Sequence, residues 1–189
     1  MKVAICAYGA GNVRSVQLAF ERLGVTAELA DDPATVRAAD LAVLPGVGSA
    51  GAAMSGLRRH GLDDALRGRA AAGQPTLGIC LGLQLALEES EEDGGVAGLG
   101  LAPGRAVRLR GGRVPRIGWA PLDGTCETHW YAHSYACETP HATAWAEGVV
   151  AEARHGSFVG CQFHPEKSAA AGARYLARVL EEVPSLSLA

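Results

Sequence analysis

The sequence predicts an α/β fold with an open, mostly parallel sheet, helices on both faces and a small antiparallel extension. Two observations support this. Short apolar segments alternate with segments of helical periodicity through the first half of the chain, which is typical of parallel strands joined by helices. From about residue 105 to 163 the segments are short and rich in turn residues. The length of 189 residues fits one domain, which we expect to span residues 1–189.

The elements of the first half follow from periodicity and punctuation. An apolar strand at 3–7 is followed, after a turn, by a helix at 13–23, in which Val16 and Phe20 recur at helical spacing and which Gly24 would end. The remaining elements are predicted as strands at 26–30 and 41–44, helices at 50–59 and 62–72, a strand at 76–79 and a helix at 81–89.

The chain closes with a predicted helix at 169–182, for which Ser168 is the expected N-cap. In open parallel sheets, sites form beyond the carboxyl ends of the strands. The loops after the first, third and fourth predicted strands are therefore expected to carry the function.

Composition excludes several classes of protein. The net charge of −3 and the pI of about 6.1 give no electrostatic footprint for nucleic acid or for a membrane surface. The apolar run at the start is too short for the core of a signal peptide, and no run approaches a membrane span. Five irregularly spaced cysteines argue against a disulfide framework, so we expect a cytoplasmic protein with reduced thiols.

A candidate nucleophile lies in Gly78-Ile79-Cys80-Leu81-Gly82, which has the form of a nucleophile elbow with Cys in place of Ser. A predicted strand precedes Cys80 and a predicted helix follows it. The start of that helix would favour a thiolate, and the N–H of Leu81 would face a developing oxyanion. Cys6 and Cys161 stand in apolar segments and are expected to be buried, unreactive thiols.

A candidate general base lies in Gln162-Phe163-His164-Pro165-Glu166. His164 and Glu166 are two residues apart, so in an extended chain both side chains would point to one face. A histidine oriented by a carboxylate is the usual arrangement for activating a cysteine. Cys80, His164 and Glu166 are therefore predicted to form a catalytic triad.

Two segments resemble motifs of the class I, or triad-type, glutamine amidotransferases. The nucleophile motif is matched by Pro75-Thr76-Leu77-Gly78-Ile79-Cys80-Leu81-Gly82-Leu83-Gln84, and the His–Glu motif is matched by residues 162–166. Four further blocks are similar to the glutaminase subunits of imidazole glycerol phosphate synthases. These blocks are Tyr8-Gly9-Ala10-Gly11-Asn12, Leu44-Pro45-Gly46-Val47-Gly48, Val114-Pro115-Arg116-Ile117-Gly118-Trp119 and Tyr131-Ala132-His133-Ser134-Tyr135. The resemblance covers almost the whole chain.

The resemblance implies a flavodoxin-like fold, glutamine as substrate and ammonia passed to a (β/α)8 cyclase subunit in a heterodimer of histidine biosynthesis. It also implies roles for individual residues. The glutamine and the oxyanion would be held by Gly46, Val47, Gly48, Leu81, Gln84, Ser134 and Tyr135. The partner subunit would be contacted by Asn12, Trp119 and Lys167.

The sequence departs from this family's pattern near the implied partner surface. The family usually has His where Arg116 stands and Asn where Ala120 stands, and the loop at 121–128 is short. Other class I glutaminases, γ-glutamyl cysteine hydrolases and a non-catalytic partner-binding module are the alternatives. The blocks at 8–12 and 114–119 count against the first two, and the intact triad counts against the third.

Two further patterns in the sequence resemble ligand sites. Cys126, His129, His133 and Cys137 have a spacing that suggests a metal site. Residues 130–135 instead predict a strand, which would hold the two histidines about 13 Å apart, too far for one zinc ion. A dinucleotide loop would need Gly where Arg14 stands. We therefore expect no metal and no cofactor, and we interpret the acidic run at 88–93 as a solvated helix end.

Overall fold

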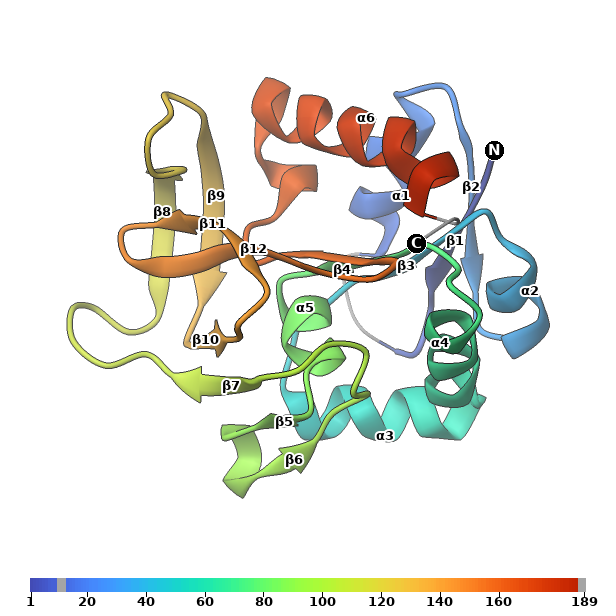
Figure 1. Ribbon diagram of the computed structural model, residues 1–189, viewed down its shortest axis with the longest axis horizontal. Coiled ribbons are helices and arrows are strands. Elements are labelled where there is room, and N and C mark those ends of the chain that lie inside the picture. Colours follow the sequence, from blue (N-terminus) through green and yellow to red (C-terminus); the bar gives the residue numbers. More distant parts are fainter. Residues whose placement is uncertain (10–12, 187–189) are drawn as a thin grey trace.

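The computed structural model describes residues 1–9 and 13–186. Its centre is a seven-stranded sheet with the order β11-β12-β13-β4-β3-β1-β2 (Figure 1). The strands are β1 (Lys2–Cys6), β2 (Thr26–Ala30), β3 (Leu41–Leu44), β4 (Thr76–Ile79), β11 (Ala142–Ala146), β12 (Val149–His155) and β13 (Phe158–Cys161). All neighbours from β13 to β2 are parallel, whereas β12 and β11 are antiparallel additions at one edge. The predicted open, mostly parallel sheet is confirmed.

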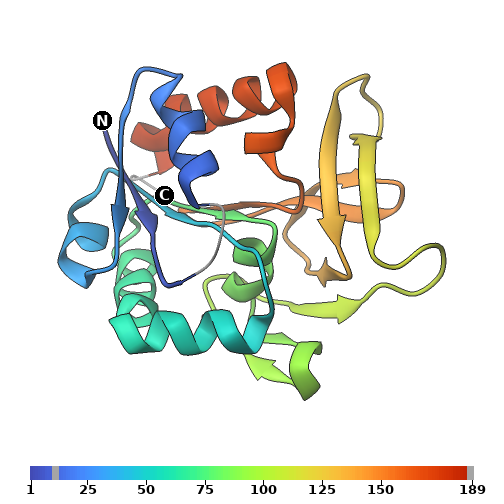
Figure 2. The ribbon, with the colours of Figure 1, turned by 180° about the vertical axis from the view of Figure 1, so that it is seen from behind.

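Helices cover both faces of this sheet, as predicted. One face carries α1 (Val13–Glu21) and α6 (Ala169–Leu186), and the other carries α2 (Pro33–Ala38), α3 (Ala50–His60), α4 (Leu62–Ala71) and α5 (Leu81–Ala86) (Figure 2). Successive side chains of a strand point to opposite faces. In β1, Val3 and Ile5 therefore join the core that includes Phe20 of α1, whereas Ala4 and Cys6 join the core beneath α3 and α4.

The local differences from the sequence predictions have local causes. The helix α2 was not predicted, although Asp32 accepts a hydrogen bond from the Thr35 N–H at 2.9 Å and Pro33 occupies the first turn. These are standard signals for the start of a helix. The helix α5 ends at Ala86 rather than at residue 89, because Glu89 and Ser90 form the short strand β5 (Glu89–Ser90).

The second half is less separate than predicted, because β11, β12 and β13 belong to the central sheet. β13 is buried along its whole length and pairs in parallel with β4, so that Cys161 lies opposite Ile79. The rest forms a four-stranded sheet and a hairpin, built from β5, β6 (Val96–Ala97), β7 (Arg105–Arg108) and β10 (Tyr135–Glu138), and from β8 (Arg116–Pro121) and β9 (Thr128–His133). The 3-10 turns are η1 (Glu92–Gly94) and η2 (Pro165–Lys167).

Ser168 precedes α6, but its side chain has a different role from the predicted N-cap. Its hydroxyl donates to the His164 carbonyl at 2.6 Å and accepts from the Trp130 N–H at 2.9 Å. The His164 N–H in turn donates to the Trp130 carbonyl at 2.8 Å. Ser168 therefore joins the segment after β13 to strand β9.

A buried arginine holds the base of the parallel sheet. Arg69 of α4 is fully buried, and its guanidinium donates to the carbonyls of Val36, Ala39 and Pro75 at 2.9, 2.9 and 2.6 Å. Three carbonyls at the end of α2 and the start of β4 are thereby satisfied without water. Within the residues that the structure describes, no helix is long and apolar enough to cross a membrane.

Candidate active site

Cys80 stands at the sharp turn between β4 and α5. Its backbone has φ 52° and ψ −108°, and a positive φ is uncommon outside glycine. Its N–H donates to the Cys161 carbonyl of the neighbouring strand at 2.7 Å. The first turn of α5 passes so close to β3 that a Cβ on Gly82 would overlap the Leu44 carbonyl oxygen. These features are those of a nucleophile elbow, with the thiol presented at the carboxyl ends of the strands.

His164 and Glu166 meet directly, with 2.9 Å between Nδ1 and Oε1, and both side chains are almost completely buried. The prediction that they share one face of an extended segment is wrong in its geometry. The strand ends at Cys161, His164 is the last extended residue, and Glu166 lies inside the 3-10 turn η2. Pro165 at the start of η2 suits such a turn because its ring fixes φ near the helical value.

The environment of His164 favours its protonated form. Burial alone would lower its pKa, but the hydrogen bonds and negative charges of Cys80 and Glu166 outweigh burial and raise the pKa to about 9. The acceptor at Nδ1 leaves Nε2 to face Cys80, the direction in which a proton would move between sulfur and imidazole.

The other four cysteines of the chain do not line the pocket beside Cys80. Cys6, Cys137 and Cys161 are buried, and burial raises the pKa of each thiol, that of Cys6 to about 12. Cys126 is exposed. Thiols held neutral by burial are poor nucleophiles.

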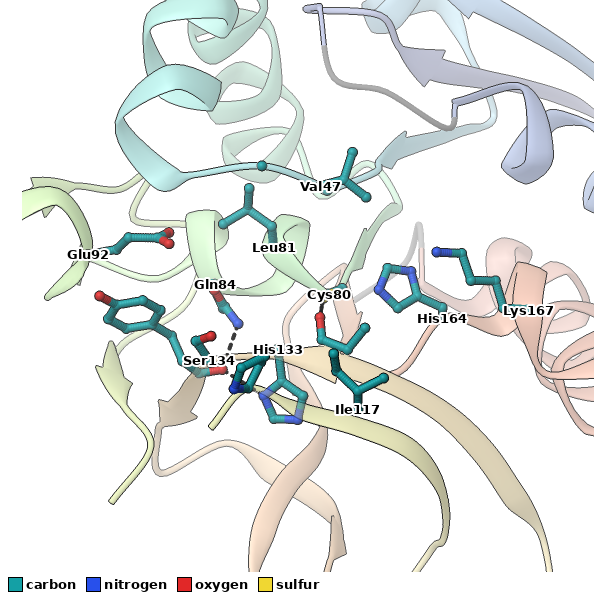
Figure 3. Close-up of a pocket in the computed structure, with 15 residues that line it drawn as sticks. Val47, Cys80, Leu81, Gln84, Glu92, Ile117, His133, Ser134, His164 and Lys167 are labelled. Carbon is teal, nitrogen blue, oxygen red and sulfur yellow. Dashed lines mark hydrogen bonds between the residues drawn. The ribbon is translucent and has the colours of Figure 1, made fainter. Parts of the chain in front are cut away.

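A pocket of about 330 Å³ opens beside Cys80 (Figure 3). The structure brings most of the residues predicted from the sequence to its wall, namely Gly46, Val47, Gly48, Cys80, Leu81, Gln84, Ser134, Tyr135, His164 and Lys167. Glu166 stands behind His164. Gly48 has φ +99°, so the loop after β3 passes the pocket in a conformation that suits glycine. Gln84 Nε2 donates to the Tyr135 carbonyl at 2.9 Å, which ties α5 to the opposite wall.

Three polar residues of the site were not predicted. Glu92 lines the pocket, and its carboxylate accepts from the Ala50 N–H at 2.8 Å while burial raises its pKa. The interpretation of the acidic run as a solvated helix end is therefore wrong for Glu92. His133 also lines the pocket, and Gln162 contacts Cys80. Both lie inside sequence blocks that had been singled out, whereas Glu92 carries no local signal.

The hairpin β8–β9 forms the outer rim of the site. Ile117 and Trp119 are 64% and 52% exposed, and Trp119 packs edge-on against Trp130 with 5.8 Å between ring centroids. Trp119 does not line the pocket, whereas Ile117 and the predicted partner residue Lys167 do. Asn12 lies outside the described residues.

Arg116, one of the departures from the family pattern, is turned toward its own chain. Its side chain is 15% exposed, and its guanidinium pairs with Glu147 at 2.8 Å and lies 4.4 Å from the centre of the Tyr131 ring. Ala120 is buried. The Arg116 side chain therefore joins the hairpin to the turn between β11 and β12, and the Ala120 side chain packs in the interior.

The histidines of the suggested metal spacing are engaged in packing. His129 stacks on Phe163 with 4.0 Å between ring centroids, and His133 Nδ1 donates to the Tyr135 carbonyl at 2.8 Å. Burial lowers the pKa of His133 to about 4, so its ring is neutral and Nε2 is unprotonated. Among residues 1–9 and 13–186, no group of three or more His, Cys, Asp or Glu side chains is placed to hold a metal ion.

Taken together, a thiol at an elbow, an imidazole beside it and a carboxylate behind the imidazole can attack a carboxamide and protonate the leaving amine. A family model for glutamine amidotransferase class-I matches residues 7–183. The chain therefore belongs to the class-I glutamine amidotransferase family, as its motifs predicted.

Individual relatives are similar over their full length. The imidazole glycerol phosphate synthase subunit HisH of Symbiobacterium thermophilum is 45% identical, with 93% of this chain and 92% of the relative aligned. The subunit of the same name from Methanothermobacter thermautotrophicus is 40% identical, with coverages of 95% and 98%. A solved structure described as a glutamine amidotransferase superposes with a TM-score of 0.80 at 20% identity, covering 96% of this chain and 98% of that one. The last comparison concerns the fold alone.

Proposed function

We propose that this chain is the glutaminase subunit of an imidazole glycerol phosphate synthase, which hydrolyses glutamine to glutamate and ammonia for histidine biosynthesis. The observation that carries the proposal is the Cys80–His164–Glu166 array in a pocket of suitable size, in a chain whose full-length relatives bear that subunit name. The chain would act as a single domain spanning residues 1–189, in the cytoplasm, where thiols stay reduced.

The proposed chemistry proceeds through a thioester. The thiolate of Cys80 attacks the side-chain amide carbon of glutamine, and the negative charge moves to the amide oxygen. The N–H of Leu81 and an N–H of the loop at 46–48 hold that oxygen. His164 gives its proton to the departing ammonia, a step that general acid catalysis accelerates by about 10²- to 10⁴-fold. His164 then takes a proton from water, the hydroxide attacks the thioester, and glutamate leaves.

Glutamine would be held by polar groups on both walls of the pocket. Gln84 of α5 lies on one wall, and Ser134 and Tyr135 lie on the opposite wall. Glu92 is the carboxylate of the pocket and offers a counter-charge for the α-ammonium group of glutamine. In Figure 3, Glu92 lies on the side of the pocket away from Lys167.

The partner would be a (β/α)8 cyclase subunit that consumes the ammonia. The exposed apolar residues of the β8–β9 hairpin support docking at this rim, because exposed aromatic side chains beside a site are typical of interfaces. We expect Asn12, Trp119 and Lys167 to contact the cyclase, and the glycine-flanked loop at 46–48 to adopt its oxyanion-binding form when the cyclase holds its nucleotide substrate.

The test is glutamate production from glutamine by the isolated chain, by the complex with the cyclase, and by the complex with the cyclase's ligand. We expect little turnover by the isolated chain and a rise at the last step. A complex that forms imidazole glycerol phosphate from added ammonia but never from glutamine would overturn the proposal.

A further inference from the structure

Gln162 is a buried polar residue in direct contact with the nucleophile. It follows β13, has no exposed surface, and places Nε2 at 3.5 Å from Cys80 Sγ. Nothing in the mechanism above uses it. A buried amide has to satisfy both its donor and its acceptor, so the neighbours of this side chain determine whether its NH₂ group or its oxygen faces the sulfur.

The orientation is set by a second amide. Gln84 Nε2 donates to Gln162 Oε1 at 3.0 Å and to the Tyr135 carbonyl at 2.9 Å. Because both partners of Gln84 are acceptors, Gln84 presents its NH₂ group and Gln162 has to present its oxygen in return. Turning the Gln162 amide over would oppose two NH₂ groups and aim an oxygen at the sulfur. The donor is therefore fixed toward Cys80.

Two further polar groups among the described residues contact the sulfur. Its thiol donates weakly to the Ala132 carbonyl at 3.9 Å, and it hydrogen-bonds with His164. The titratable groups around it include His164 with Glu166 behind it, His133, Tyr8, Cys137 and Cys161, and Lys167 on the pocket wall. Burial keeps Tyr8, Cys137, Cys161 and His133 neutral.

We infer that Gln162 holds Cys80 Sγ in place and stabilises its thiolate through a fixed, uncharged N–H donor. When the S–H bond breaks, the electron pair stays on sulfur and the proton goes to His164. The N–H of Gln162 then faces a full negative charge, and hydrogen bonds to charged groups are about twice as strong as those between neutral groups. Because the amide does not titrate, its contribution is the same at every working pH. The inference rests on the proposed function for its biological meaning.

The test measures ionisation of Cys80 directly, in the full chain. The rate of iodoacetamide alkylation at Cys80 is followed against pH, with each cysteine resolved by mass spectrometry. Gln162→Leu removes the donor, and Gln162→Glu keeps the size while replacing the donor with a carboxyl group. We expect the pH midpoint of Cys80 alkylation to rise by about one unit in Gln162→Leu, a tenfold loss of thiolate below the midpoint, and further in Gln162→Glu.

Two controls are built into the chain. Gln74→Leu changes a glutamine whose side chain donates to the Arg37 carbonyl away from the pocket, and should leave the Cys80 midpoint where it is. The exposed Cys126 should alkylate identically in every variant. A Cys80 midpoint that stays unchanged, or falls, in both Gln162 variants would overturn the inference.

The two proposals fail separately. If the wild-type complex hydrolyses glutamine and Cys80→Ala abolishes that activity while the alkylation midpoints do not move, the role of Gln162 is wrong and the function stands. If the midpoints move but Cys80→Ala leaves glutamine hydrolysis intact, the thiolate contact stands and the proposed function is wrong.

Discussion

The two walls of the pocket differ in how much of their side-chain surface is buried within this chain. The inner wall is formed by the β4–α5 elbow and the segment from Gln162 to Glu166, whose side chains are buried and mutually hydrogen-bonded. The outer rim is formed by the β8–β9 hairpin, where Ile117 and Trp119 are largely exposed. The inner wall is supported by the central sheet, whereas β8 and β9 form a separate two-stranded sheet that is joined to the segment after β13 by the hydrogen bonds of Trp130.

We infer that the inner wall carries the reaction and that the rim carries the contact with the partner. Reactive groups need fixed distances, and burial between packed strands supplies them. A rim that exposes aromatic and aliphatic side chains is suited to a partner. We therefore expect changes in the inner wall to abolish or impair the reaction, and changes at the rim to alter coupling to the cyclase.

The largest effect should come from the nucleophile. Cys80→Ala removes the atom that forms the thioester, so glutamine-dependent synthesis by the complex should fall by at least about 10³-fold. Ammonia-dependent synthesis should be unchanged, because that route bypasses the thiol. Parallel assays with glutamine and with ammonium salts measure both activities. Equal losses in the two assays would contradict the assignment of Cys80 to the release of ammonia from glutamine.

The partners of the nucleophile should rank below it and in order. His164→Ala removes the proton carrier, whereas Glu166→Ala removes the group that orients it, so the first should cost more in kcat than the second. The measurement is the kcat of each variant for glutamine hydrolysis in the cyclase complex. A larger loss for Glu166→Ala would reverse the assigned roles.

The frame beneath the inner wall should be sensitive to Arg69. Arg69→Met keeps most of the side-chain volume but removes the arginine donor from the carbonyls of Val36, Ala39 and Pro75, of which Pro75 still accepts from the Ala42 N–H. We expect a loss of about 3–5 kcal/mol in the free energy of unfolding, measured by urea denaturation. Arg59→Met, in the last turn of α3, is the matched control and should change stability by less than about 0.5 kcal/mol.

The protonated His164 should make stability depend on pH. Its pKa is raised from about 6.5 in the unfolded chain to about 9, so this stabilisation is fully present below pH 6.5 and is lost as the pH rises through 9. The loss should be about 3 kcal/mol, and Glu166→Gln should reduce it by removing the carboxylate that faces the ring. Denaturation at pH 6, 7.5 and 9 for both proteins provides the measurement; identical pH profiles would contradict the assignment.

The smallest effect should arise at the rim. Trp119→Ala removes an exposed ring, so the stability of the isolated chain should barely change, whereas affinity for the cyclase should fall about tenfold, or 1.4 kcal/mol. Calorimetric titration of the two subunits measures the affinity. Trp145→Ala, which changes an exposed ring on the edge strand β11, is the control and should leave the affinity unchanged.

The sequence by itself determined the parts of this protein that depend on short stretches of chain. The alternation of apolar and helical segments predicted a parallel sheet with helices on both of its faces. The glycines around Cys80 predicted the elbow, because a sharp strand-to-helix turn needs residues without side chains next to the crowded backbone. The pairing of His164 with Glu166 was also predictable, although the turn that brings them together was not.

Only the tertiary structure decided which residues distant in the sequence meet at the pocket. β13 lies beside β4 because two buried apolar strands pair in parallel, and periodicity does not encode which strands pair. That pairing brings Gln162 to Cys80 across a sequence separation of 82 residues. Glu92 likewise reaches the pocket by accepting a hydrogen bond from the start of α3, a contact 42 residues away along the chain. Contacts at such separations depend on the packing of the whole sheet, so local patterns in the sequence do not predict them.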